Sequence, residues 1–136
     1  IFWLIHHRQF HFVRVVDPKL LWINVFLLIF IVLIPFSTDV AGDYPEVPIA
    51  VLFFHVNILA IGLIFALHWK HICRSGHLCD PRPDEDVIRA RFIDTTLILI
   101  VAATAICISL FSSPVSLLVY LVIPVVIVLL NPQSLF

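Results

Sequence analysis

The chain has 136 residues, of which 62% are hydrophobic and 12% charged, and its mean hydropathy is +1.12. A soluble domain of this size needs far more charge to cover its surface. The net charge of −1 lacks the global basicity typical of a nucleic-acid-binding protein. The sequence therefore predicts an integral membrane protein of the all-α class, a polytopic helix bundle with the lipid bilayer as a partner and no nucleic acid.

Four stretches without a charged residue follow one another along the chain, at 20–38, 49–67, 95–113 and 115–130. A bilayer core of about 30 Å is crossed by about 20 apolar residues in a helix. We therefore expect one transmembrane helical domain over 1–136, with four complete spans and the end of a fifth. Their expected bounds are about 19–40, 48–69, 87–112 and 114–131, with the partial span at 1–14.

The connectors between these spans alternate in charge. The connector 6–19 carries three basic residues and one acid, 39–48 carries three acids and no base, and 70–91 carries five lysines and arginines. The positive-inside rule places the two basic connectors in the cytoplasm. The partial span then enters from outside, so we expect an earlier crossing upstream of this sequence and six spans in all.

Two kinds of residue within the spans predict contacts between helices. Gly62 and Ala66 form a small-xxx-small pair that lets two helices approach closely. His55 and Asn57 are polar side chains on nearly opposite faces of one helix. For these two residues we expect hydrogen bonds to neighbouring helices rather than an ion site.

Charged residues near the start of the third complete span predict local pairs. Glu85 and Arg89 have the i,i+4 spacing that favours an ion pair, and Arg91 lies three residues before Asp94. A local pair with Arg91 is the simpler interpretation of Asp94. A carboxylate that handles protons within the membrane is the alternative.

Four separated motif pieces in the first half of the chain resemble the transmembrane protein 175 family. They are Trp3-x-x-His6-His7-Arg8-x-Phe10, Leu21-Trp22-Ile23-Asn24, Ile34-Pro35-Phe36-Ser37-Thr38 and Gly42-Asp43-Tyr44. The resemblance implies a potassium-permeable channel of the single-repeat type found in prokaryotic cell membranes. It further implies a six-span subunit with both ends cytoplasmic, four copies of which form a homotetramer around one pore, with potassium as the permeant ion.

The family's signature, Arg-x-x-x-Phe-Ser-Asp on a pore-lining first span, does not occur in this sequence. The run Phe36-Ser37-Thr38-Asp39 only superficially resembles the Phe-Ser-Asp part of this signature, and it lies at the outer end of a different span. We therefore expect the pore helix to lie upstream of this sequence. The residues present would then form the scaffold around it.

The resemblance implies that Trp3, His6, His7 and Asn24 brace the pore-helix motif. A buried arginine and aspartate need hydrogen-bonding partners, because unpaired they cost several kcal/mol. Adjacent histidines point about 100° apart on a helix, so we expect only one of the two to join Asn24. The alternative is that the histidines and Trp3 are ordinary residues of the membrane interface.

Two further groups are candidate sites in the connectors. Asp39, Asp43 and Glu46 would form an acidic ring at the outer pore mouth of a tetramer, which raises the local cation concentration. An ordinary solvated loop explains them equally well. A second group could close a tetrahedral zinc site, although its spacing matches no common finger and reduced cytoplasmic thiols are the default; it consists of His71, Cys73, His77 and Cys79.

Three classes of function compete. The first is a subunit of an oligomeric cation channel without a cofactor, and the second is an accessory membrane subunit without transport. The third is a haem-binding redox protein, but His55 and His68 lie about 140° apart on their helix, on the wrong faces for stacked haems. Because the spans offer no convincing nucleophile and base pair, we do not expect an enzyme.

Overall fold

The computed structural model describes residues 1–79, 82–123 and 125. Within them the elements are α1 (Phe2–Phe10), α2 (Pro18–Asp43), α3 (Pro48–Arg74), α4 (Glu85–Ser109), α5 (Ser113–Leu118) and a 3-10 turn η1 (Val119–Leu121). No strand occurs among these residues, and only an isolated bridge joins Val13 to Cys79. The all-helical class is confirmed.

The three long helices are the candidate membrane spans of the described part. α2, α3 and α4 have 26, 27 and 25 residues and are apolar enough to cross a bilayer. At 1.5 Å per residue each is at least about 37 Å long, which exceeds the hydrocarbon thickness of about 30 Å. Of the expected span at 114–131, the structure describes residues 114–123 and 125, which include most of α5 and all of η1, and the remainder lies outside the described residues. That span stays a prediction.

Helix bounds differ from the expected spans by up to five residues: α2 ends at Asp43 rather than 40, and α3 ends at Arg74 rather than 69. α1 ends at Phe10, four residues before the expected end at 14, and the chain then turns. α4 occupies Glu85–Ser109 rather than 87–112. It begins earlier because the acidic first turn suits a helix N-terminus, and it ends before the turn at 110–112.

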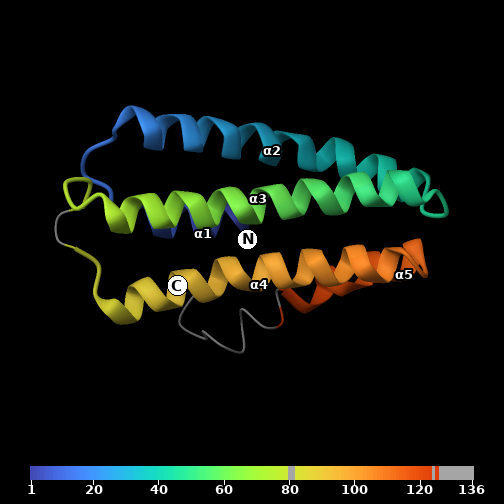
Figure 1. The fold of residues 1–136 in the computed structure, drawn as a ribbon. Coiled ribbons are helices and arrows are strands. Elements are labelled where there is room, and N and C mark those ends of the chain that lie inside the picture. Colours follow the sequence, from blue (N-terminus) through green and yellow to red (C-terminus); the bar gives the residue numbers. More distant parts are fainter. Residues whose placement is uncertain (80–81, 124, 126–136) are drawn as a thin grey trace.

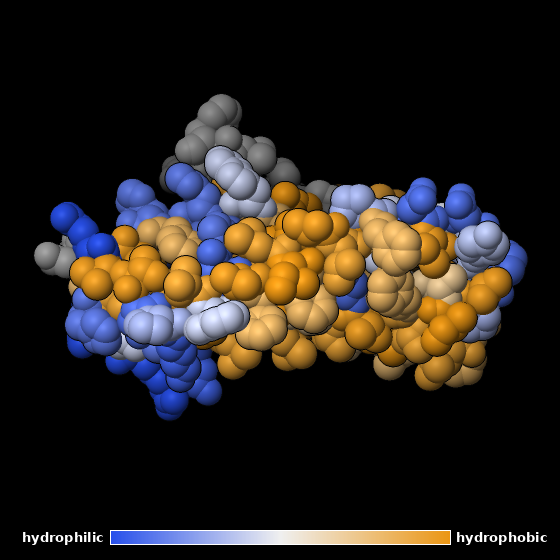
Figure 2. Space-filling view, turned by 90° about the horizontal axis from the view of Figure 1, so that it is seen from above, coloured by the Kyte–Doolittle hydropathy of each residue, from blue (hydrophilic) through white to orange (hydrophobic). Residues whose placement is uncertain are grey.

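The helix α3 is the centre of the bundle, with α2 on one side and α4 on the other (Figure 1). α1 lies behind α3, and α5 folds back against α4. The helices α1, α2, α3 and α4 all contribute to one hydrophobic core cluster. Its seven buried residues are Ile5, Leu27, Ile58, Ile61, Phe65, Ile98 and Ala102. Figure 2 shows a broad apolar band between two hydrophilic ends, the pattern of a protein embedded in a bilayer.

The two ends of the bundle differ in charge. The connectors 11–17, 75–79 and 82–84 lie at one end, called the basic end here because all eight lysines and arginines lie in these connectors or in the two helix turns next to them. The connectors 44–47 and 110–112 lie at the opposite, acidic end, with Asp39, Asp43 and Glu46. This separation follows the charge alternation of the sequence.

Gly62 lets α3 and α4 approach closely, as its small-residue spacing predicted. A Cβ at this position would lie 3.0 Å from Leu99 Cδ2 and 3.1 Å from Ile98 Cγ2. Both contacts are side chains of α4. The absence of a side chain at Gly62 therefore sets the distance between these two helices.

Asp17 joins α2 to α3 at the basic end of the bundle. Its Oδ1 accepts a hydrogen bond from Leu20 N at 2.6 Å, which caps α2, and its Oδ2 accepts one from His71 Nε2 of α3 at 2.9 Å. These two hydrogen bonds, the one from Leu20 first, lower the pKa of the Asp17 carboxyl below its usual value. One carboxylate thus starts α2 and ties it to the last turn of α3.

Replacing Gly62 by leucine is expected to destabilise the protein by about 1–3 kcal/mol, because the new side chain has no room beside Leu99 and Ile98. Gly42→Leu is the matched control, since a Cβ there meets nothing within 4 Å. Thermal unfolding in detergent, followed by tryptophan fluorescence, compares the two variants. An equal loss of stability in both would contradict the close α3–α4 contact.

Asp17→Ala is expected to lower the melting temperature at pH 7 and to remove part of the acid sensitivity of the wild type. The folded-state pKa lies below the unfolded value, so this carboxylate stabilises the fold above the unfolded pKa, and the effect is lost as pH falls through the folded pKa. Melting curves from pH 7 to pH 3 measure both effects. Asp17→Asn, which can still cap α2 but carries no charge, should retain more stability at pH 7.

Candidate functional site

A polar cluster lies where α1 meets α2 and α3, towards the basic end of the bundle. His6 of α1 donates its Nε2 hydrogen to Asn24 Oδ1 of α2 at 2.8 Å. Asn24 lies in the second turn of α2, within an otherwise apolar helix. The structure thus brings together two of the four residues that the family resemblance singled out.

The other two residues, Trp3 and His7, lie on a different face of α1. Their rings stack with centroids 5.1 Å apart and an interplanar angle of 9°. Both are exposed, Trp3 to 72%. The turn of about 100° between adjacent helical residues separates His7 from His6, so one histidine faces the bundle and the other faces out.

Sequence reasoning missed two members of the cluster, Gln9 and His68. Both are fully buried, and His68 Nδ1 of α3 donates to Gln9 Oε1 at 2.7 Å. Phe10 packs against the rings of both His6 and His68, at centroid distances of 4.5 and 5.0 Å. The spacing of Gln9 three residues after His6, on the same helix face, was the signal that could have found it.

The cluster has unused hydrogen-bonding capacity. Gln9 Nε2 and His68 Nε2 are buried and have no hydrogen-bond partner within the described residues. A buried polar atom without a partner costs about 1–3 kcal/mol, so such atoms mark places where a further polar group fits. Gln9 Nε2 can therefore still donate a hydrogen bond, and His68 Nε2 can still accept one.

The polar side chains in the outer half of α3 form hydrogen bonds between helices, which confirms the prediction for both. His55 pairs through Nε2 with Ser116 Oγ at 2.8 Å and through Nδ1 with Tyr120 Oη at 2.9 Å. Asn57 Nδ2 donates to Ser37 Oγ of α2 at 3.1 Å. Because both ring nitrogens of His55 are engaged, this residue has no atom free to bind haem iron.

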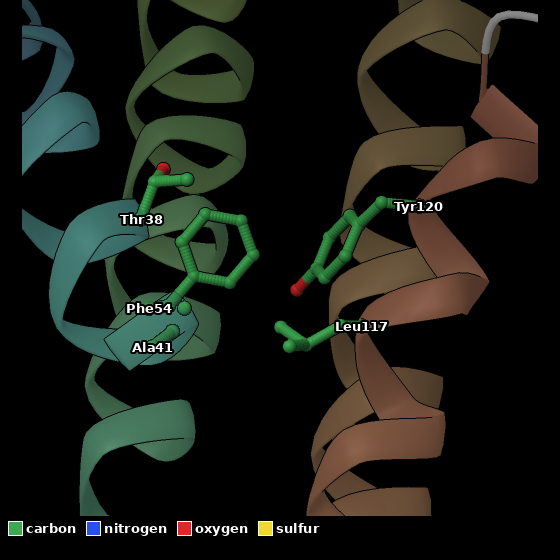
Figure 3. A pocket seen from close by; sticks show the side chains of 6 residues that line it. Thr38, Ala41, Phe54, Leu117 and Tyr120 are labelled. Carbon is green, nitrogen blue, oxygen red and sulfur yellow. The ribbon is translucent and has the colours of Figure 1, made fainter. Parts of the chain in front are cut away.

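An apolar pocket of about 250 Å³ lies beside Tyr120 at the acidic end (Figure 3). It lies between α2 and α3 on one side and α5 with η1 on the other. The Tyr120 hydroxyl bonds to His55, and the Thr38 hydroxyl donates to Ile34 O at 2.7 Å. The pocket therefore offers apolar surface, with Ala41, Gly42, Phe54 and Leu117 completing its lining.

The four candidate zinc ligands are not gathered in one site. His71 bonds to Asp17, and His77 is exposed. Cys79 is buried in an apolar cluster, and this burial raises the pKa of its thiol, which opposes the thiolate form that binds metal. Across residues 1–79, 82–123 and 125, no three metal-binding side chains come together.

The three acidic residues expected at the outer pore mouth, Asp39, Asp43 and Glu46, are all exposed at the acidic end. Asp39 and Asp43 lie on the last turns of α2.

The expected local ion pair in α4 is confirmed. Arg91 Nη1 donates a hydrogen bond to Asp94 Oδ2 at 2.8 Å.

The prediction of an ion pair between Glu85 and Arg89 was wrong. Both side chains are exposed, and neither takes part in an ion pair of the described chain. In water an exposed pair gains too little to hold two long side chains together.

Comparison with known proteins assigns the sequence that forms this cluster to a family. The family model described as "Endosomal/lysosomal potassium channel TMEM175" matches residues 1–35, the segment that contains His6, Gln9 and Asn24. A protein of Streptomyces collinus named a potassium channel is 32% identical over 94 residues, which is 66% of this chain and 46% of that protein. The chain belongs to the TMEM175 family.

Two further relatives match the chain, and the human one covers more of it. A human protein named endosomal/lysosomal proton channel TMEM175 is 29% identical over 132 residues, or 93% of this chain and 26% of that protein. A Chamaesiphon minutus protein named a potassium channel is 28% identical over 66% of this chain and 46% of its own length. The chain thus spans less than half the length of these curated relatives. No solved structure matches it.

Family membership and the three long apolar helices together make this an integral membrane protein. The relatives are named as channels and not as enzymes. The segment matched by the family model is also the segment that contributes α1 and most of α2 to the polar cluster. This cluster is therefore the candidate functional site.

Asn24→Leu is expected to destabilise the protein by about 1 kcal/mol, because it leaves the partly buried His6 Nε2 without its acceptor. The double variant His6→Phe/Asn24→Leu should recover most of this loss, since both polar groups are then removed together. His7→Phe serves as the control on the exposed face of α1 and should be nearly neutral. Thermal unfolding measures all three, and a double variant no better than Asn24→Leu would contradict the pairing.

Proposed function

We propose that this chain is part of a subunit of an oligomeric, potassium-permeable cation channel. The observation that carries the proposal is the His6–Asn24 pair, which lies within the segment that matches the TMEM175 family. Relatives from two bacteria are named potassium channels, and the human relative is named a proton channel. The residues present form the scaffold, and the pore is lined by a helix that lies outside this sequence.

The polar cluster is the part of the scaffold that holds the pore helix in register. A pore helix that carries arginine and aspartate needs hydrogen-bonding partners in the bilayer. His6 and Asn24 are already paired, while Gln9 Nε2 and His68 Nε2 retain one donor and one acceptor for such partners. Trp3 and His7 lie on the exposed face of α1, where they can pack against a neighbouring helix.

The pore lies on the axis of a homotetramer and is narrowed by apolar side chains, which gate conduction by dewetting. α2 exposes several large apolar side chains, including Trp22, Phe26 and Val32, which other helices, other subunits or lipid must cover. In the tetramer, the exposed carboxylates of Asp39, Asp43 and Glu46 form a ring at the outer mouth. Such a ring concentrates cations before they enter the pore.

Orientation follows from charge. The basic end faces the cytoplasm of a prokaryotic cell, so the connectors 6–19 and 70–91 are cytoplasmic, and the acidic end faces outward. In this orientation the carboxylates meet the ions that arrive from outside. The permeant ion needs no resident cofactor.

Flux through liposomes that contain the full-length gene product tests the proposal. We expect potassium flux above sodium flux, with proton flux measured in parallel because relatives are named for both ions. Asn24→Leu should reduce potassium flux several-fold, since the loss of this partly buried hydrogen bond, which contributes about 1 kcal/mol, displaces the pore helix from its conducting register.

His7→Phe is the control for Asn24→Leu, and Asp39→Asn/Asp43→Asn/Glu46→Gln tests the acidic ring. The triple variant should lower flux at low salt and approach the wild type at high salt, because salt screens exposed charges. No flux of any cation from a well-folded oligomer would overturn the proposal in favour of an accessory subunit without transport.

A further inference from the structure

The face of α4 that points away from α3 carries a groove that the channel proposal does not use. The groove has a volume of about 290 Å³ and is lined by Arg89, Phe92, Ile93, Thr96, Leu97 and Ile100. Buried residues of α4, such as Ile98, Ala102 and Ala105, lie on the opposite side of the helix and pack towards the core. The groove therefore opens on the outer surface of a candidate membrane span.

Charge is ordered along this face of α4. Glu85 lies in the first turn at the basic end, Arg89 follows one turn deeper, about 6 Å along the axis, and the apolar groove follows Arg89. Both charged side chains are exposed, and neither is engaged in an ion pair with a described residue. The order from the helix start inward is thus anion, cation and hydrocarbon-lined groove.

A zwitterionic phospholipid has the complementary order. Its ammonium group is outermost, its phosphate follows, and its acyl chains lie in the hydrocarbon. We propose that the α4 groove binds a phospholipid with an ammonium–phosphate headgroup. The phosphate pairs with the Arg89 guanidinium, the ammonium pairs with the Glu85 carboxylate, and one acyl chain lies along Phe92, Ile93 and Ile100.

The local acids select against a purely anionic lipid. Asp84, Glu85 and Asp86 lie at the start of α4, so a lipid with net negative charge meets three carboxylates beside Arg89, and the nearby Arg91 is already paired with Asp94. A guanidinium binds phosphate well, through charge-assisted hydrogen bonds. An ammonium group in the same headgroup turns the neighbouring carboxylate from a repulsive into an attractive contact. This site is independent of the proposed channel function.

Lipid retention by the purified full-length protein tests the site. Native mass spectrometry after mild delipidation should show phosphatidylethanolamine retained in preference to phosphatidylglycerol. Arg89→Gln should lower that retention about threefold, the size expected for one partly exposed ionic contact. Melting in phosphatidylglycerol nanodiscs should shift upward as phosphatidylethanolamine is added, and Arg89→Gln should reduce that shift.

Two controls make the test specific. The swap Glu85→Arg/Arg89→Glu keeps the net charge but reverses its order, and it should lose the preference for phosphatidylethanolamine. Lys70→Gln removes an exposed cation from α3 at the same end and should change nothing. Since these side chains are all exposed, the variants are expected to fold.

Three outcomes would overturn the proposal. One is equal retention of phosphatidylglycerol with no effect of the swap, which would indicate an unspecific cationic contact. Another is no lipid preference in the wild-type protein. The third is an inter-subunit crosslink from Ile93→Cys in a Cys107→Ser background, which would show that a second copy of the chain covers the groove.

Discussion

Four polar side chains of α3 need partners before that helix can lie in hydrocarbon, and each finds its partner in a different element. Bilayer hydrocarbon offers no water, so an unpaired group there is costly. The pairs run from His55 to Ser116 and Tyr120, from Asn57 to Ser37, from His68 to Gln9 and from His71 to Asp17. The central helix is thereby tied to α5, η1, α2, α1 and the cap of α2 at defined heights along its axis.

These hydrogen bonds determine how the helices are positioned relative to one another more than they add to the stability of the bundle. A hydrogen bond between helices in a membrane contributes on average only about 0.6 kcal/mol, while an orphaned partner costs more. Apolar faces alone would let α2 and α4 slide along α3, because lipid solvates them equally well. The polar pairs oppose sliding of α2, the hydrogen bond that Trp69 Nε1 donates to Ile88 O at 3.2 Å opposes sliding of α4, and Gly62 fixes how closely α4 approaches.

The two ends of the bundle differ in the number of buried polar atoms that have no partner in the described chain. Towards the acidic end, both nitrogens of His55 are paired and the nearby pocket is apolar, and the amide oxygen of Asn57 is the one such atom. At the cluster nearer the basic end, Gln9 and His68 each keep one buried atom without a partner in the described chain. A scaffold that holds another helix needs such unused groups on the side where that helix packs. This difference, and the family match over residues 1–35, direct the functional interpretation to the α1–α2–α3 junction.

The sequence by itself determined the membrane class, the all-helical architecture and the separation of basic from acidic connectors, because uncharged runs and loop charges are local properties of the chain. It also separated His6 from His7 through the helical repeat. Only the tertiary structure decided that His6 meets Asn24, that Gln9 and His68 complete the cluster and that His71 binds Asp17 rather than a metal. The same holds for Arg89, whose spacing from Glu85 favours a pair that does not form. Partners 18 to 59 residues apart are chosen by helix packing, and no local pattern encodes which faces meet.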